Sequence, residues 1–154
     1  MRITDRLKAE HGIFLRQLKT LERMLAQGAP AEALGAAVAV IAEAEDHHSE
    51  LEDRVLYPAL LRVLGAEEAT LQGVAREHVR LRELSSAILS GRFEAKDISE
   101  YARLGREHFE HEIHGVFVLA EEWISEQELE RMANWNVDHT FEELGHPAPW
   151  KEKP

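Results

Sequence analysis

His48-Ser-Glu-Leu-Glu52 and His108-Phe-Glu-His-Glu112 are two copies of one pattern, a histidine followed four residues later by a glutamate. On an α-helix this spacing places both side chains on the same face, about one turn apart. Apolar residues recur at helical spacing around both copies, because Ile41 precedes His48 by seven residues and Leu104 precedes His108 by four. The pattern therefore predicts that each pair faces the interior of a helical protein.

Two further histidines interrupt apolar helical stripes in the same way. His11 lies between Leu7 and Phe14, and His78 follows Val74 by four residues. For any one of these residues alone, a packed core histidine or a solvated glutamate is the commoner situation. A cluster of four imidazoles and two carboxylates in an apolar interior, however, needs a cation to offset the cost of burial. The coincidence predicts six metal ligands, which are His11, His48, Glu52, His78, His108 and Glu112.

The rest of the chain is also predicted to be helical. Apolar residues recur at helical spacing almost everywhere, and no segment shows the sustained alternation of a half-buried strand. We expect helices over about residues 4–27, 31–64, 67–90 and 97–124, and a shorter one from 125 to about 144. Because the connections are short, successive long helices should pack antiparallel. The predicted fold class is all-α, an up-down antiparallel four-helix bundle over residues 1–124, with an additional shorter C-terminal helix and tail over 125–154 that completes a single domain.

Local signals refine these boundaries. Pro58 lies inside the second helix, where it removes one backbone hydrogen bond and is expected to kink or break the helix. Asp97 with Glu100, and Ser125 with Glu128, have the spacing of a capping box, so we expect each pair to begin a helix.

Composition limits the classes of partner. The chain has 154 residues, 44% of them hydrophobic, and a formal net charge of −11, which disfavours nucleic acid and anionic membranes as partners. No apolar run approaches the roughly 20 residues of a spanning helix, and no apolar segment follows Met1, so we expect a soluble, unprocessed, cytoplasmic protein. The absence of cysteine excludes thiolate ligands, so any metal is bound through nitrogen and oxygen.

The ligand count indicates which metal. If each glutamate bridges two ions and the histidines divide two and two, a shared oxygen gives five ligands per ion and leaves one octahedral position open. Such oxygen-bridged ions favour iron or manganese over zinc. We therefore expect two iron ions, joined by an oxo or hydroxo bridge, with manganese as the alternative.

The same residues give the chain a resemblance to the hemerythrin-like, or HHE cation-binding, domains. The resemblance covers most of residues 5–120 and rests on Glu10-His11, on the segment His48–Pro58, on Glu77-His78 and on the second HxxxE pair at His108. It implies a four-helix bundle with a non-haem di-iron centre, and functions that range over oxygen binding, oxygen or redox sensing, nitric oxide chemistry and iron supply or repair.

The chain also departs from the oxygen-carrying hemerythrins. Those proteins have a second histidine four residues from the one in the third helix and an HxxxxD pair in the fourth, whereas this chain has Val74, Arg82 and Ile113 at these positions. It resembles a four-His, two-Glu variant. Fewer histidines leave both ions open, which favours redox reaction with small ligands over stable oxygen carriage.

Several alternatives remain open at this level. The favoured hypothesis is a di-iron protein that binds or reduces oxygen, nitric oxide or peroxide, which makes it a candidate oxidoreductase without a protein nucleophile. The alternatives are an iron store or donor, and an oxygen or redox sensor without turnover. Any protein partner or dimer contact is unknown.

The remaining histidines and the C-terminal segment lie outside this pattern. We expect His47 and His114 to face solvent or a neighbouring helix, and His111 to lie at the rim, with an outer-shell or exchanging-ligand role as the alternative. Tyr57 is expected either to pack or to hydrogen-bond a bridging ligand. The C-terminal helix, which holds His139 and precedes His146, is expected to cap the bundle, and gating or dimerisation is a hypothesis for it.

Overall fold

The computed structural model describes residues 1–65 and 68–135. Within these ranges every regular element is helical and no strand occurs, so the all-α prediction is confirmed for them. The elements are α1 (Ile3–Ala26), α2 (Ala31–Leu51), η1 (Glu52–Leu56), α3 (Tyr57–Leu64), α4 (Ala69–Leu89), α5 (Ala95–His111), η2 (Glu112–Val116), α6 (Phe117–Trp123) and α7 (Glu126–Ala133), where η denotes a π-helical turn.

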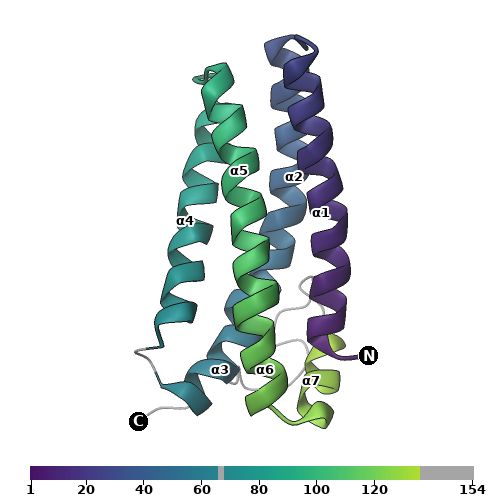
Figure 1. Ribbon diagram of the computed structural model, residues 1–154, viewed down its shortest axis with the longest axis vertical. Coiled ribbons are helices and arrows are strands. Elements are labelled where there is room, and N and C mark those ends of the chain that lie inside the picture. Colours follow the sequence, from purple (N-terminus) through teal and green to yellow (C-terminus); the bar gives the residue numbers. More distant parts are fainter. Residues whose placement is uncertain (66–67, 136–154) are drawn as a thin grey trace.

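The four long helices surround one interior (Figure 1). Helix α1 packs against α2 and α5, and α4 packs against the same two helices from the other side. In Figure 1 the α1–α2 and α4–α5 turns lie at one end of the molecule, and α3, α6 and α7 lie at the other, near the N-terminus. Helix α7 packs on α1 and α6. The helices that carry the predicted ligands therefore all border the same core.

A π-helical turn interrupts each of the two helices that carry an HxxxE pair. In η1 the backbone N–H of Tyr57 donates to the carbonyl of Glu52, five residues earlier, and in η2 that of Phe117 donates to Glu112. The first turn lies directly before Pro58, so the chain bends through a wider turn and does not break. The second turn contains no proline and was not predicted. Such turns occur mostly at functional sites.

The buried apolar side chains form two clusters, one toward each end of the bundle. One cluster includes Leu7, Leu51 and Phe117, and the other includes Phe14, Leu18 and Tyr101. Along α1 the first cluster ends at Leu7 and the second begins at Phe14, so His11 lies between them. The predicted ligands therefore occupy a polar layer between two apolar layers.

Helix ends agree with most of the predicted signals. Glycines 28, 65 and 91 follow α1, α3 and α4 and have φ between 74° and 93°, a region that other residues rarely adopt. Ser125 caps α7 and its Oγ accepts from the Glu128 N–H, as predicted. The expected start at Asp97 was wrong, because α5 begins at Ala95 and Asp97 instead accepts from the Glu94 N–H at 2.7 Å.

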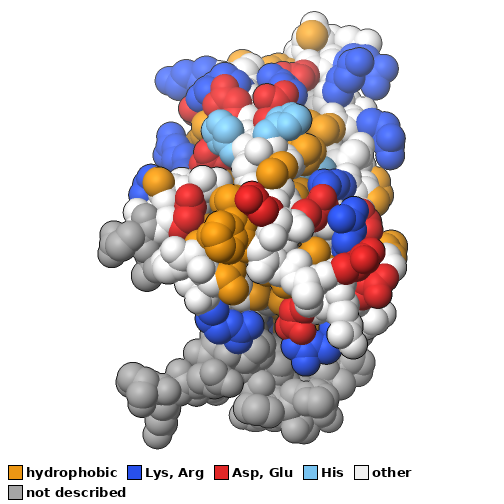
Figure 2. All heavy atoms as spheres, turned by 60° about the horizontal axis from the view of Figure 1, so that its bottom comes forward, with side chains coloured by type: hydrophobic (Ala, Val, Ile, Leu, Met, Phe, Trp, Pro, Cys, Tyr) orange, Lys and Arg blue, Asp and Glu red, His pale blue; other side chains and the backbone are white. Residues whose placement is uncertain are grey.

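Two further observations concern the whole described part of the chain. None of its helices is long and apolar enough to cross a membrane. Figure 2 shows acidic, basic and apolar side chains interspersed over the face it draws, without one basic field. The predicted C-terminal helix begins as expected, but α7 ends at Ala133, and the predicted extension to about residue 144, with His139 and His146, lies outside the described residues.

Candidate metal centre

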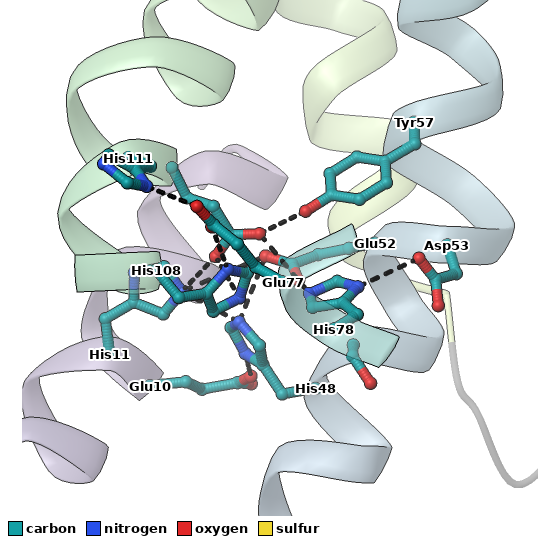
Figure 3. A network of polar contacts seen from close by, with 12 residues as sticks. Glu10, His11, His48, Glu52, Asp53, Tyr57, Glu77, His78, His108 and His111 are labelled. Atoms are coloured by element: carbon teal, nitrogen blue, oxygen red, sulfur yellow. Dashed lines mark hydrogen bonds and ion pairs between the residues drawn. The ribbon is translucent and has the colours of Figure 1, made fainter. Parts of the chain in front are cut away.

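The structure brings all six predicted ligand residues together. Each long helix contributes one histidine, and each glutamate is the first residue of a π-helical turn. His11, Glu52 and Glu112 have no exposed surface, and the other three are at most 4% exposed. Figure 3 shows five of these side chains, labelled, pointing toward one common point in the bundle interior. The four stripes of apolar residues position them, because each histidine replaces one apolar side chain on an inward face.

The six side chains form two groups of four that share both glutamates. His11 and His48 make up one group with Glu52 and Glu112, and His78 and His108 make up the other. In each group the candidate ligand atoms lie within 4.8 Å of one another. Each group offers nitrogen and oxygen atoms close enough together to hold a metal ion.

The carboxylate oxygens lie between the groups. Glu52 directs Oε1 toward His48 Nε2 at 3.1 Å and Oε2 toward His78 Nε2 at 3.4 Å. Glu112 Oε2 lies 3.2 Å from His11 Nε2 and 3.3 Å from His108 Nε2. Each carboxylate therefore faces a histidine of both groups, as a bridging ligand must.

Several of these atoms lack any other partner. Both oxygens of Glu52, Glu112 Oε2 and His78 Nε2 are buried without a hydrogen bond in the described residues. Buried polar atoms are nearly always satisfied, and an unpaired buried carboxylate is costly. His11 Nε2 and His48 Nε2 also lie only 2.8 Å apart, within hydrogen-bond distance of each other. A pair of cations fits these residues, because it would satisfy all of these atoms at once.

Three outer carboxylates orient the histidines. Glu10 lies 2.7 Å from Nδ1 of His48. Asp53 lies 3.2 Å from Nδ1 of His78, and Glu77 lies 3.0 Å from Nδ1 of His108. In each pair the imidazole N–H donates to a carboxylate from another helix (Figure 3), which leaves Nε2 free to bind a cation. The Nδ1 atom of His11 has no such partner in the described residues.

Sequence reasoning missed this outer layer, although its signal is visible in hindsight. Glu10 and Glu77 directly precede candidate ligands, in the pairs Glu10-His11 and Glu77-His78. Each serves the histidine of the next long helix and not its own neighbour. A glutamate directly before an inward-facing histidine on a helix lies at the side of the core face, where it can reach the neighbouring helix. This adjacency was the signal available in the sequence.

The π-helical turns place one aromatic ring against each group. Tyr57, five residues after Glu52, stacks on His78 with ring centroids 5.8 Å apart, and its hydroxyl donates to Glu112. Phe117, five residues after Glu112, lies 5.2 Å from His11. The wider turn brings the fifth residue back over the first. Tyr57 therefore packs in the core, as one of the two expectations had it, and its hydroxyl also contacts the candidate ligand Glu112.

His47 and His114 are exposed, in agreement with the expectation that they lie outside the site. His111 is also exposed, but its Nδ1 lies 2.6 Å from Glu77 Oε1, and Glu77 in turn holds His108. His111 is thus one step removed from the candidate ligands, at the rim of the site.

The cluster binds protons strongly when no cation is present. Burial opposes protonation of His48, but the charge of Glu52 and the hydrogen bond to Glu10 outweigh it and raise the pKa of His48 to about 10. Burial is likewise outweighed at His78, where the hydrogen bond to Asp53 and the nearby carboxylates of Glu112 and Glu52 raise the pKa to about 12. At His11 burial prevails and lowers the pKa. Two protons thus partly compensate the two buried glutamates.

We expect cations to displace these two protons. A raised pKa means that the metal-free protein retains both protons across about pH 6 to 9, and a bound cation requires an unprotonated Nε2. Affinity for the cation should therefore rise with pH, by up to about tenfold per pH unit for each displaced proton. Titration of metal-free protein with a divalent cation in weak buffer should release about two protons per chain, and binding without proton release would contradict this.

We also expect Glu10 to strengthen metal binding through His48. Replacing an outer carboxylate typically weakens metal affinity about 10- to 100-fold, so Glu10→Ala should do so. Glu10 also pairs with Arg6 at 3.1 Å, so Arg6→Ala is the matched control, and it should leave the affinity near that of the original protein. Competition with a chromogenic chelator measures both. Equal losses in the two variants would assign the effect to the Arg6 pair.

The comparisons with known proteins agree with this geometry. The family model of the hemerythrin HHE cation binding domain matches residues 2–146. Searches of curated proteins and of solved structures returned no match. The match spans nearly the whole chain and includes all six candidate ligands, so the chain belongs to the hemerythrin HHE cation-binding domain family.

Proposed function

We propose that the chain is a non-haem di-iron protein, built as an up-down antiparallel four-helix bundle, that binds or reduces a small ligand such as oxygen, nitric oxide or peroxide. The observation that carries the proposal is the pair of four-residue groups that share Glu52 and Glu112. Each cation position would receive two imidazoles and two bridging carboxylates. A shared oxygen would bring each ion to five ligands, so an octahedral ion would retain one open position.

Iron bound in these positions would supply open coordination sites and a reversible change of oxidation state. The residues of the chain would determine how that chemistry is used. Glu10, Asp53 and Glu77 hold three imidazoles through Nδ1, so that each Nε2 stays directed at the centre. The hydroxyl of Tyr57 holds Glu112 in place, and burial raises the pKa of Tyr57, so this hydroxyl keeps its proton.

The four-His, two-Glu composition supports reaction over carriage. The positions that supply extra histidine and aspartate ligands in oxygen-carrying hemerythrins are Val74, Arg82 and Ile113 in this chain. Iron bound by these residues would have fewer protein ligands than in those carriers, and so would be open to a diatomic ligand or peroxide. The same nitrogen and oxygen donors also suit manganese, so the loaded metal must be measured.

Burial of the site favours a resident centre over an iron donor. All six candidate ligands are at most 4% exposed, and none lies on a surface from which an acceptor protein could take the ion directly. Ready transfer of the metal to an apo acceptor would support the donor function instead.

The test combines metal content with spectroscopy. Protein from iron-supplemented medium should contain two irons per chain, and its optical spectrum should change on exposure to oxygen, nitric oxide or peroxide. His48→Ala should lose iron, whereas His47→Ala, an exposed neighbour on the same helix, should retain it. A loaded protein whose spectrum responds to none of the three ligands would refute the reactive function, and a folded protein without metal would refute the centre.

A further inference from the structure

A small hollow lies beside the candidate centre, between α2, α4 and α5. His48, His78 and His108 line one side of it, and neither Glu52 nor Glu112 is among its lining residues. The two cation positions both include the glutamates, so the hollow is next to these positions and does not coincide with them. The centre of a water-sized molecule can occupy about 20 Å³ inside it. About 10–15 Å³ on this measure holds one water, so the hollow suits a ligand of a few atoms.

One of the residues that line this hollow has a carboxylate oxygen without a hydrogen-bond partner in the described residues. Glu45 lines it, and the Tyr101 hydroxyl donates to Glu45 Oε2 at 2.6 Å. The other oxygen, Oε1, is buried and has no hydrogen-bond partner in the described residues. Burial raises the pKa of Glu45 to about 7, so this carboxyl accepts or gives a proton near neutral pH. A buried, unpartnered oxygen beside an open space indicates a ligand that can hydrogen-bond to it.

The hollow adjoins a groove on the surface. A wider surface groove, of about 450 Å³, shares Ala42, Asp46, Arg82 and Ser85 with the lining of the hollow. Arg82 stands at this junction and donates to Ser49 Oγ at 3.0 Å and to Asp53 Oδ2 at 3.1 Å. Asp53 also holds His78, so the junction is directly connected to the candidate ligands. A small molecule in this hollow would lie beside both Glu45 and the candidate ligands His48, His78 and His108.

We propose that this hollow is the subsite that holds the small ligand beside the metal centre, and that the free oxygen of Glu45 selects a ligand with an O–H group, such as hydrogen peroxide, over diatomic gases without one. The inference rests on the proposed function and adds to it the class of ligand. Hydrogen peroxide donates an O–H to a carboxylate oxygen, whereas nitric oxide has no proton to donate. Both molecules are neutral and small, so size and charge do not separate them.

The test removes the Glu45 carboxylate without leaving the Tyr101 hydroxyl unpaired. In the double variant Glu45→Leu/Tyr101→Phe both members of the hydrogen bond become apolar, which limits the cost to folding. The matched control is Tyr101→Phe, which leaves Glu45 in place. Glu45→Gln is a second, conservative variant, in which the amide oxygen serves Tyr101 and an N–H replaces the free acceptor.

Binding and reaction are read out separately. Peroxide affinity is measured on zinc-loaded protein, in which the ion cannot change oxidation state, by a chemical-shift titration of Phe109, which lines the hollow. The rate of nitric oxide binding is measured on iron-loaded protein. The double variant and Glu45→Gln should bind peroxide about 10- to 100-fold more weakly than Tyr101→Phe, the loss expected for one hydrogen bond to a charged group, with nitric oxide binding unchanged.

The possible failures are distinguishable. If the double variant, Glu45→Gln and Tyr101→Phe all bind peroxide with equal affinity, Glu45 does not select the ligand. The proposed function would still stand in that case, provided that the iron-loaded protein binds nitric oxide. A loss of nitric oxide binding in the same variants would also overturn the role of Glu45. The substitutions would then have damaged the metal centre itself and not the selection of peroxide over nitric oxide. An iron-loaded protein that binds neither ligand would overturn the proposed function and this inference together.

Discussion

Replacing Glu112 by alanine should leave the protein without either bound cation. Glu112 belongs to both four-residue groups, and its Oε2 lies within 3.3 Å of a histidine from each. Its loss removes a shared ligand and its negative charge from both positions, so two neighbouring divalent ions would repel each other with only Glu52 left to offset their charge. Metal content per chain after iron loading measures the effect, with an expected fall from two ions to near none.

The control for this variant is Glu110→Ala. Glu110 is exposed on α5, two residues earlier, so its replacement removes the same charge from the protein without touching the centre. Circular dichroism should show that Glu112→Ala keeps its helices, because the layers above and below the centre remain packed. Full metal content in Glu112→Ala would show that Glu112 does not bridge.

The convergence of the six side chains could be predicted because helix geometry alone determines it. His48 and Glu52, and likewise His108 and Glu112, lie four residues apart, and the π-helical turn begins at the glutamate, so the α-helical phase holds up to that residue. Beyond the glutamate the phase changes. The proximity of Tyr57 to Glu112 and of Phe117 to His11 therefore could not be derived from a period of 3.6 residues.

Proline accounts for only one of the two π-helical turns. Pro58 indicated an irregularity in the second helix, but η2 has the same backbone bond pattern around Gly115 without any proline. The outer carboxylates were missed for a different reason. Glu10 reaches from α1 to His48 on α2, and such a contact depends on the separation and rotation of two helices, which one sequence does not specify. Residues within one helix could be placed, whereas contacts between helices required the structure.

The polar layer also explains why the centre matters for stability as well as chemistry. Six ionisable side chains, all at most 4% exposed, occupy the middle of a core that is otherwise apolar. Without cations, Glu52 keeps two unsatisfied oxygens, and protons on His48 and His78 provide only part of the compensation. Removing ions from a site of this kind leaves buried charge without its partner, which is strongly destabilising.

Removal of the metal should therefore lower the free energy of unfolding by several kcal/mol. A ligand that binds only the folded chain stabilises it by about 4 kcal/mol when its free concentration is a thousand times its dissociation constant, and two ions that share Glu52 and Glu112 act together. Thermal unfolding of loaded protein and of protein stripped with a chelator measures the difference. Glu112→Ala provides the control, because without a complete site its unfolding midpoint should not respond to added metal. Equal midpoints for the loaded and stripped original protein would mean that the buried glutamates and histidines are already satisfied by protons, and that the cations contribute to reactivity without contributing to the fold.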